Sequence, residues 1–511
     1  MKGKWIRIVL LTIFLVQALQ LVHWVRADSM PPSWDQSWHA MISISQYNQF
    51  LGIESGLGGN ACDRFPILNW AKNFYPPGFH TTTIPFYLLF GVSYDSAVLT
   101  NILYLLVLIA CTYLIAWKIF DEKSGLIASF IISTIPVINV LMMEYLIDFS
   151  LTAMVAAGLT ALLYTENFRN LKYSLLFGIV FGVGTLVKWN YFMYLIAPFA
   201  YTLMIFIKQE IIRGRRYFQA RNIVLAALTA ILIASLWYTP GQIQVTFPAV
   251  YYAAFNQGMI EGEPNLFTSE SLTHYVYTII HDYSLFYSII LLIGLGVIAC
   301  SWRKIENQRG IVFLIITVLG IYFFSSMLWN KNNRYIVPIY IPLTVLSSIG
   351  LSMVGEKRWG RIIIGLMVIG GFASIFALNT SLIDSYYFHA GVSIFDFRGK
   401  YPNSPEVSVE SILDSLNDSA KGNPFTTCIT VESENLNDVN IPYYAFKDDY
   451  PVKYIIGNGC NPLEYDYVIY GPIEKTWRSH LFKESEYVIR NNPEKFQEIF
   501  REKEVVVYKR K

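Results

Sequence analysis

Long apolar runs separated by short polar stretches fill residues 1–383. An α-helix needs roughly 17–25 residues to cross the hydrocarbon core of a bilayer, so each run is measured against that length. The pattern predicts a polytopic α-helical membrane protein with about 11 spans, a count that a short run such as Tyr173–Val187 could change by one or two. The candidate spans are Ile8–Val25, Ser96–Trp117, Ser124–Met143, Phe149–Thr165, Tyr173–Val187, Trp189–Ile207, Asn222–Tyr238, Tyr283–Trp302, Gly310–Asn330, Tyr335–Gly355 and Ile362–Ile383.

Three longer polar segments interrupt or follow the apolar runs. They are a first loop at 26–95, a second loop at 239–282 and a tail at 384–511. The tail predicts a small α/β domain, because an amphipathic stretch precedes several short β-branched runs. The expected helices are Glu406–Ser419 and Pro493–Phe500, the latter with Asn492 as its cap, and the expected strands are Cys428–Val431, Tyr467–Tyr470 and Val505–Tyr508.

Basic residues divide unevenly between the two sides of this topology. Clusters such as Lys2–Arg7, Lys208–Arg221 and Arg303–Arg309 fall on connections of one side, and that side is cytoplasmic by the positive-inside rule. The N-terminus is therefore expected in the cytoplasm, and both long loops and the tail are expected outside a cell (inner) membrane. No small-residue cleavage site follows the first run, which we interpret as an uncleaved helix.

Composition supports the membrane assignment and excludes some partners. The chain is 54% hydrophobic and 15% charged, against about 25% charged in soluble domains. A net charge of +2 gives no reason to expect nucleic acid. The five cysteines show no metal-ligand spacing, and the sequence leaves open whether Cys428 pairs with Cys460.

Ionisable residues at the outer ends of the predicted helices are the candidates for function. A charged side chain near the hydrocarbon usually faces a cavity or a partner, because its burial in lipid costs at least ~2.5–3.5 kcal/mol. The alternative is that these are ordinary loop charges at helix ends. The set comprises three acids and three bases: Asp35, Glu144, Asp148, Lys188, Lys331 and Arg334.

Several short motifs, in order, resemble those of the GT-C glycosyltransferases, specifically the bacterial relatives of the protein O-mannosyltransferases and of the lipid A aminoarabinose transferase. The resemblance covers most of Met1–Leu378, whereas the tail adds no family signal. Its landmarks are Trp34-Asp35-Gln36-Ser37-Trp38-His39, Tyr75-Pro76-Pro77-Gly78-Phe79, Glu144–Leu151, Gly182–Trp189 and Asn333-Arg334-Tyr335-Ile336-Val337-Pro338.

The resemblance implies transfer of a sugar from a polyprenyl-phosphate donor to an acceptor hydroxyl outside the membrane, with inversion. The acceptor could be a glycan, a lipid or a protein. We expect Asp35 to act as general base, because a hydroxyl with a high pKa needs one. Lys188 and Arg334 would hold the donor phosphate, the first as a point charge and the second as a bidentate fork. Asp148 would orient the acceptor or hold a positive partner.

The remaining candidate residues are assigned by position. Glu144, His39 and Tyr335 are expected to contact substrate, although His39 is more simply a hydrogen-bonding residue at the interface. The aminoarabinose transferases carry a basic residue just before their Pro-Pro pair, whereas Phe74-Tyr75 stands there in this chain, so Lys72 or Arg64 would take that phosphate contact.

Gln36 stands where many relatives carry a second acid, which keeps open a non-catalytic protein that binds lipid-linked sugar. The other alternative is a secondary transporter, which should show repeated halves and ion sites near the membrane midplane. Only Asp35, Glu144 and Asp148 could bind a divalent metal, and we expect no metal and no cofactor.

Overall fold

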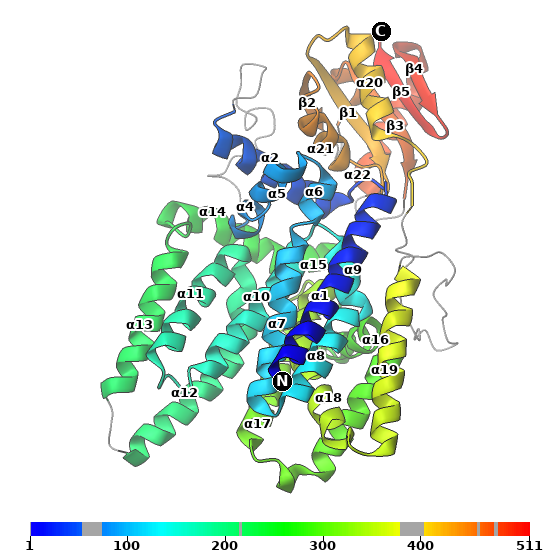
Figure 1. Cartoon of the computed structure of the whole chain (residues 1–511). Coiled ribbons are helices and arrows are strands. Elements are labelled where there is room, and N and C mark those ends of the chain that lie inside the picture. Colours follow the sequence, from blue (N-terminus) through cyan, green and yellow to red (C-terminus); the bar gives the residue numbers. More distant parts are fainter. Residues whose placement is uncertain (1, 54–73, 214–216, 379–402, 457–459, 475–478) are drawn as a thin grey trace. The chain divides into compact units, whose positions relative to one another are not determined.

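The computed structural model describes residues 2–53, 74–213, 217–378, 403–456, 460–474 and 479–511. They form two compact units. The described residues of 1–25, 74–79 and 99–401 form a helical unit, and those of 26–73, 80–98 and 402–511 form an α/β unit. Figure 1 labels the elements of both units.

The helical unit contains long helices and several short turns of helix. In chain order they are α1 (Lys2–Ala27), α7 (Asn101–Ile119), α8 (Glu122–Thr134), α9 (Pro136–Met143), α10 (Ile147–Tyr164), α11 (Leu171–Val187), η3 (Trp189–Phe192), α12 (Met193–Arg213), α13 (Tyr217–Ala234), α14 (Pro240–Tyr251), η4 (Tyr252–Asn256), α15 (Gln257–Glu261), α16 (Ser269–Cys300), η5 (Trp302–Lys304), α17 (Gln308–Ser326), η6 (Asn333–Ile339), α18 (Tyr340–Val354) and α19 (Arg358–Leu378).

The polytopic helical architecture predicted from the apolar runs is confirmed. Within the described residues, eight helices are long and apolar enough to cross a membrane, or nine if a bent pair counts as one span. That pair is α8 and α9, which meet at an angle of 58°. Pro136 begins α9 and supplies no N–H, so the chain bends there. Two further predicted runs form shorter apolar helices, Leu171–Val187 and Ala220–Ala234, which accounts for the difference from eleven.

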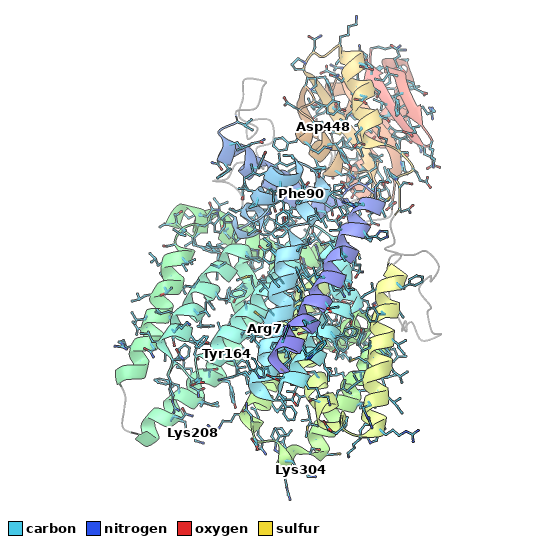
Figure 2. All side chains as sticks on the ribbon, in the orientation of Figure 1. Arg7, Phe90, Tyr164, Lys208, Lys304 and Asp448 are labelled. Atoms are coloured by element: carbon cyan, nitrogen blue, oxygen red, sulfur yellow. A yellow bond between two sulfur atoms is a disulfide. The ribbon has the colours of Figure 1, made fainter. Side chains whose placement is uncertain are left out.

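Two of the basic clusters lie at the same end of the helical unit. Figure 2 shows Lys208 and Lys304 at one end of this unit, and Figure 1 shows α14 at the other. Both lysines belong to the basic clusters that the sequence analysis assigned to one side of the membrane.

The helices of this unit pack closely. A Cβ atom at Gly182 of α11 would lie 2.7 Å from the Cβ of Ile233 on α13. The glycine therefore serves helix packing, as small residues do in membranes.

The α/β unit combines the first loop with the tail. Its helices are α2 (Trp34–Leu51), α4 (Gly78–Thr81, which begins in the helical unit), α5 (Ile84–Phe90), α6 (Tyr94–Val98), α20 (Val409–Ala420), α21 (Asn440–Lys447), η7 (Pro462–Glu464), α22 (Ser479–Asn491) and η8 (Pro493–Lys495). Its strands are β1 (Phe425–Glu432), β2 (Val452–Ile456), β3 (Tyr467–Ile473), β4 (Phe496–Glu502) and β5 (Val505–Arg510).

The five strands form one mixed sheet in the order β2-β1-β3-β5-β4. Strand β1 pairs in parallel with β2 and β3, whereas β5 pairs antiparallel with β3 and β4. Helix α20 buries Ile412, Leu413 and Leu416 in the core that β1 also lines. The α/β tail, its first helix and its three predicted strands are thus confirmed.

One predicted element of the tail is wrong. The helix expected at Pro493–Phe500 is only a single 3-10 turn, Pro493–Lys495, after which the chain continues as β4. Asn492 makes no capping hydrogen bond with its side chain. Phe496 is buried beneath the sheet and β4 forms a hairpin with β5, turning at Lys503, whose φ is 50°. Strand pairing therefore overrides the local helix signal.

Cys428 and Cys460 form a disulfide, with their Cα atoms 5.9 Å apart. The bond links β1 to the segment before η7, and both cysteines are buried. Such bonds persist in oxidising compartments.

We expect loss of this disulfide to weaken the sheet. Closing a loop with a sequence separation of 32 stabilises a fold by about 3–4 kcal/mol in the chain-entropy treatment. Hydrogen exchange of the β1 amides in the full chain should therefore show a lower opening free energy in the Cys428→Ser/Cys460→Ser variant. Cys300→Ser, at an exposed free cysteine, is the matched control. Unchanged exchange in the double variant would contradict this.

Candidate active site

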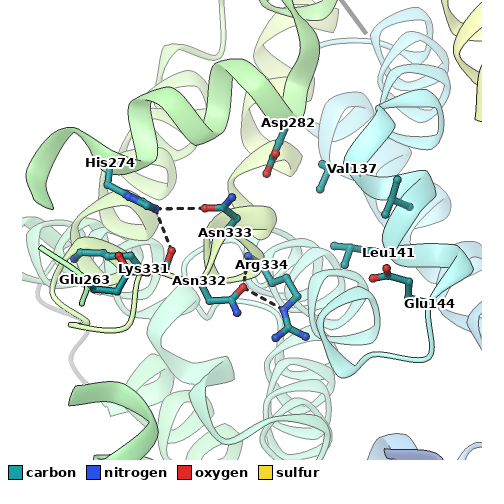
Figure 3. Close-up of a pocket in the computed structure, with 11 residues that line it drawn as sticks. Val137, Leu141, Glu144, Glu263, His274, Asp282, Lys331, Asn332, Asn333 and Arg334 are labelled. Atoms are coloured by element: carbon teal, nitrogen blue, oxygen red, sulfur yellow. Dashed lines mark hydrogen bonds between the residues drawn. The ribbon is translucent and has the colours of Figure 1, made fainter. Parts of the chain in front are cut away.

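A cavity of about 500 Å³ lies within the helical unit. Figure 3 shows the side chains around it, which come from α9 and the residue after it, the α15–α16 connection, α16, the two residues before η6 and the first turn of η6. Apolar residues supply one part of the wall and ionisable residues another. The lining residues are Val137, Val140, Leu141, Glu144, Glu263, His274, Asp282, Lys331, Asn332, Asn333 and Arg334.

Arg334 is held in place by its own local sequence. Asn332 is the cap of η6, and its Oδ1 accepts hydrogen bonds from both the backbone N and the side-chain Nε of Arg334, each at 3.1 Å. The guanidinium is thereby oriented before any ligand arrives. Only Nε of the guanidinium contacts Asn332, and the terminal Nη groups point away from Asn332 (Figure 3).

Helix α16 holds the preceding loop. His274 Nε2 lies 3.0 Å from the carbonyl oxygen of Lys331 and 3.3 Å from Asn333 Oδ1, and Thr278 donates to Asn333 Oδ1 at 3.2 Å. These contacts connect the N-terminal part of α16 to the residues that flank Arg334. Neither His274 nor Thr278 was predicted from the sequence as a functional residue.

Arg334 also belongs to a buried ionic network. Lys188 Nζ lies 2.6 Å from Asp148 Oδ1, and Arg334 Nη1 lies 3.8 Å from Asp148 Oδ2. The Asp148 and Lys188 side chains are 3% and 6% exposed, whereas that of Arg334 is 27% exposed. Two cations share one carboxylate, so the group carries net positive charge, and Arg334 presents it to the cavity.

Local structure explains these positions. Asp148 lies in the first turn of α10, where the helix dipole favours a carboxylate. Lys188 follows the last residue of α11, where the dipole favours a cation. Gly184 leaves room for the ring of Tyr191 to pack directly on α11, which allows the chain to turn into η3. Lys188 Nζ also lies 5.1 Å from the ring centre of Tyr335, within the range of a cation–π interaction.

Glu144 ends α9 and lines the cavity. Asn101 fixes the backbone there, because its Nδ2 donates to the carbonyl oxygens of Met142 and Glu144, each at 2.9 Å. The side chain of Glu144 is thus presented on the same cavity as Arg334.

Asp282 also lines the cavity and was not predicted from the sequence as a site residue. It is buried, and it precedes a break in α16 at Ser284, where φ is 69°. A non-glycine residue in this conformation is strained, and such strain is often found beside functional sites. The only signal in the sequence is the boundary between the second loop and the apolar run at Tyr283.

Lys331, one of the ionisable residues around the cavity, stabilises the local backbone. Its Nζ donates to the carbonyl oxygens of Ser326 and Leu328, each at 2.6 Å, which satisfies backbone groups at the end of α17. Burial lowers the pKa of Lys331 to about 8, and the charge of Glu263 opposes this shift in part. Lys331 therefore stabilises the loop that carries Arg334.

We expect a distinctive pH dependence from Lys331. The folded protein releases this proton near pH 8, whereas an unfolded lysine keeps it up to about pH 10.5. The unfolded chain then binds more protons between these values, so stability rises with pH across that window. The thermal midpoint of the wild type should rise relative to that of Lys331→Met between pH 8 and pH 10. A constant difference would contradict the assignment.

Asp35 and His39 lie on α2 in the α/β unit. Asp35 is exposed in the first turn of α2, and the pair Ser33 and Gln36 forms a capping box around it. Tyr94 donates to Gln36 Oε1 at 2.6 Å. Gln36 thus has a structural role in place of a second acid. His39 is buried, and its Nδ1 lies 3.1 Å from Nε2 of His80.

The structure brings together five of the six predicted ionisable residues within the helical unit, and Asp35 belongs to the other unit. Lys72 and Arg64 lie outside the described residues. Among the residues that the structure describes, no group of three His, Cys, Asp or Glu side chains could hold a metal ion.

The fold expected from the resemblance in the sequence is confirmed: the chain has an ArnT-like architecture of membrane-type helices with a small C-terminal mixed β-sheet region. Residues 75–238 match the family model described as dolichyl-phosphate-mannose-protein mannosyltransferase. No curated protein matches the sequence.

Solved structures show the same fold over nearly the whole chain. ArnT from Cupriavidus metallidurans, solved bound to undecaprenyl phosphate, is similar with a TM-score of 0.63 and 12% identity, over 98% of this chain and 97% of that one. The oligosaccharyltransferase of Archaeoglobus fulgidus, in complex with Zn and sulfate, gives 0.56 and 12% over 90% and 68% of the two chains. The archaeal oligosaccharyltransferase AglB from Archaeoglobus fulgidus, with an inhibitory peptide and a dolichol-phosphate, gives 0.53 and 11% over 90% and 69%.

Proposed function

We propose that this protein is a glycosyltransferase that moves a sugar from a polyprenyl-phosphate donor to an acceptor hydroxyl, with inversion. The observation that carries the proposal is the buried network of Lys188, Asp148 and Arg334 beside the cavity. The match of residues 75–238 to a glycosyltransferase family and the structure of ArnT with undecaprenyl phosphate support it.

The chemistry of the leaving group suits this network. When the anomeric carbon–oxygen bond breaks, its electron pair passes to the phosphate oxygen, so negative charge develops there. Preorganised cations stabilise such charge strongly when water is excluded. Lys188 and Arg334 would hold the phosphate, and Asp148, which lies between them, would offset their mutual repulsion and orient both. In this proposal Asp148 is a positioning residue that holds positive partners.

Asp35 would take the proton of the acceptor hydroxyl. The acceptor oxygen then bonds to the anomeric carbon from the face opposite the leaving phosphate, which gives inversion. The products are the glycosylated acceptor and polyprenyl phosphate. Glu144 and Tyr335 would contact the sugar or the acceptor; His39 packs against His80 and would act through α2.

We further propose that the α/β unit lies outside the membrane. The Cys428–Cys460 disulfide requires an oxidising compartment, and the basic clusters around Lys208 and Lys304 favour the cytoplasmic side. Two observations of different kinds thus agree on the orientation.

Release of polyprenyl phosphate tests the proposal. The purified full chain, reconstituted with a mixed pool of lipid-linked sugars and candidate acceptors, should release polyprenyl phosphate in step with acceptor glycosylation. Binding of the lipid without release would favour the non-catalytic binding protein. Absence of both binding and release would favour the transporter.

A further inference from the structure

A buried glutamate lies at the carboxyl end of the central parallel strand β1. Glu432 is the last residue of β1 and is 0% exposed. Its backbone is fixed, because its carbonyl oxygen accepts from Glu474 N at 2.8 Å and it pairs with Ile473 of β3. In α/β sheets the carboxyl ends of parallel strands are where functional residues are presented.

The Glu432 carboxylate contacts the helix that carries Asp35. Trp34 Nε1 donates to Glu432 Oε1 at 3.2 Å. Trp34 is the first residue of α2 and immediately precedes Asp35. Burying a carboxylate costs free energy unless hydrogen bonds satisfy it. Loss of the Trp34 hydrogen bond should therefore matter more here than loss of a similar bond at an exposed surface.

Other contacts within the α/β unit hold the same helix. Ser29 N donates to the carbonyl oxygen of Asn403 at 2.8 Å, and Asn403 N donates to Asp28 Oδ1 at 2.9 Å. Helix α21 packs against α2, and the turn before α21 is fixed by the buried side chain of Asn437, whose Oδ1 accepts from Asn440 N at 2.9 Å. The tail thus contacts both the segment that precedes α2 and the helix itself.

We propose that Glu432 is a positioning residue for catalysis: through Trp34 it sets the rotation of α2 about its own axis, and hence the direction of the Asp35 carboxylate. This inference rests on the proposed role of Asp35 as base. Residues of a helix are separated by 100° of rotation, so a fixed Trp34 fixes the direction of its neighbour. A misplacement of about 1 Å in a reacting group can lower a rate by roughly 100-fold.

The inference is tested by steady-state kinetics on Trp34→Phe, Glu432→Ala and Glu432→Gln in the full chain. Trp34→Phe removes the donor and keeps an aromatic ring, whereas Glu432→Gln keeps an oxygen acceptor. We expect Trp34→Phe and Glu432→Ala to lower kcat by about 10- to 100-fold, with KM for the donor nearly unchanged. Glu432→Gln should restore most of kcat. The double variant Trp34→Phe/Glu432→Ala should have the same kcat as the slower single variant, because the two substitutions remove the same hydrogen bond.

Glu434→Gln, at an exposed glutamate two residues further along, is the matched control and should behave as wild type. The thermal midpoint and the content of the Cys428–Cys460 disulfide report whether each variant folds. If Glu432→Ala does not fold, the kcat values of Trp34→Phe and Glu432→Gln test the positioning role. Wild-type kcat in Trp34→Phe and Glu432→Ala, with Asp35→Asn inactive, overturns the positioning role alone. An active Asp35→Asn enzyme overturns the proposed base, and with it the basis of this inference.

Discussion

Replacing Asp35 by Asn should lower sugar transfer by about two to four orders of magnitude, the range that general-base catalysis contributes. The amide cannot accept the acceptor proton, yet it has nearly the same size and can keep hydrogen bonds. Asp35 is exposed in the first turn of α2, so the change should leave the fold intact. Initial rates of acceptor glycosylation at saturating donor measure the effect.

The control for this experiment is Asp418→Asn, at an acid on α20 in the same unit but outside the proposed site. It should have wild-type activity. The Asp35→Asn variant should still bind polyprenyl phosphate, because the proposed phosphate ligands lie in the helical unit. Full activity of Asp35→Asn would show that another group is the base, and Glu144, which lines the cavity, would then be the next residue to test.

The second large effect is expected at the cation network. Replacing Arg334 by Gln should weaken binding of polyprenyl phosphate by about 10- to 100-fold, because hydrogen bonds to charged groups contribute about 1.5–3 kcal/mol. Arg334 is the most exposed member of the network, so it is the least costly to replace. Binding to the reconstituted protein, measured as a Kd, reports the loss, and kcat should fall with it. Arg361→Gln, at an exposed arginine in the first turn of α19, is the control.

Lys188 needs a different design. Removing it alone leaves Asp148 with a weaker partner in a buried site, and loss of one member of a buried ion pair typically costs about 3–5 kcal/mol of stability. The pair Lys188→Met/Asp148→Asn removes both charges and should fold better than Lys188→Met. If the double variant binds polyprenyl phosphate as tightly as wild type, Lys188 is not a phosphate ligand.

Much of the helical unit could be predicted from the sequence. Apolar runs of sufficient length form helices in a membrane because the backbone must satisfy its own hydrogen bonds there. Lys188 and Asp148 were identifiable for a related reason: a charge at the end of an apolar run needs a partner or water. Their pairing at 2.6 Å follows from the packing of α10 against α11, which no local pattern encodes.

The misassigned Pro493–Phe500 helix shows the limit of local signals. Asn-Pro followed by charged residues is a good helix start, but β4 pairs with β5 and the burial of Phe496 decides the outcome. The same holds for Gln36. In the sequence it is a departure from relatives, whereas in the fold it caps α2 and contacts Tyr94.

Hydrophobic run length, strand composition and isolated charges are local properties, so they were enough to predict the membrane class, the α/β tail and the ionisable residues worth testing. Which side chains pair with one another became visible only in the folded chain. Asp148 forms ion pairs with Lys188 and Arg334, and Lys331 donates to a carbonyl oxygen at the end of α17. Glu432 accepts a hydrogen bond from Trp34, 398 residues away in the sequence. Those contacts arise from packing between elements distant in the chain, and their partners have no periodicity or spacing that a linear pattern could reveal.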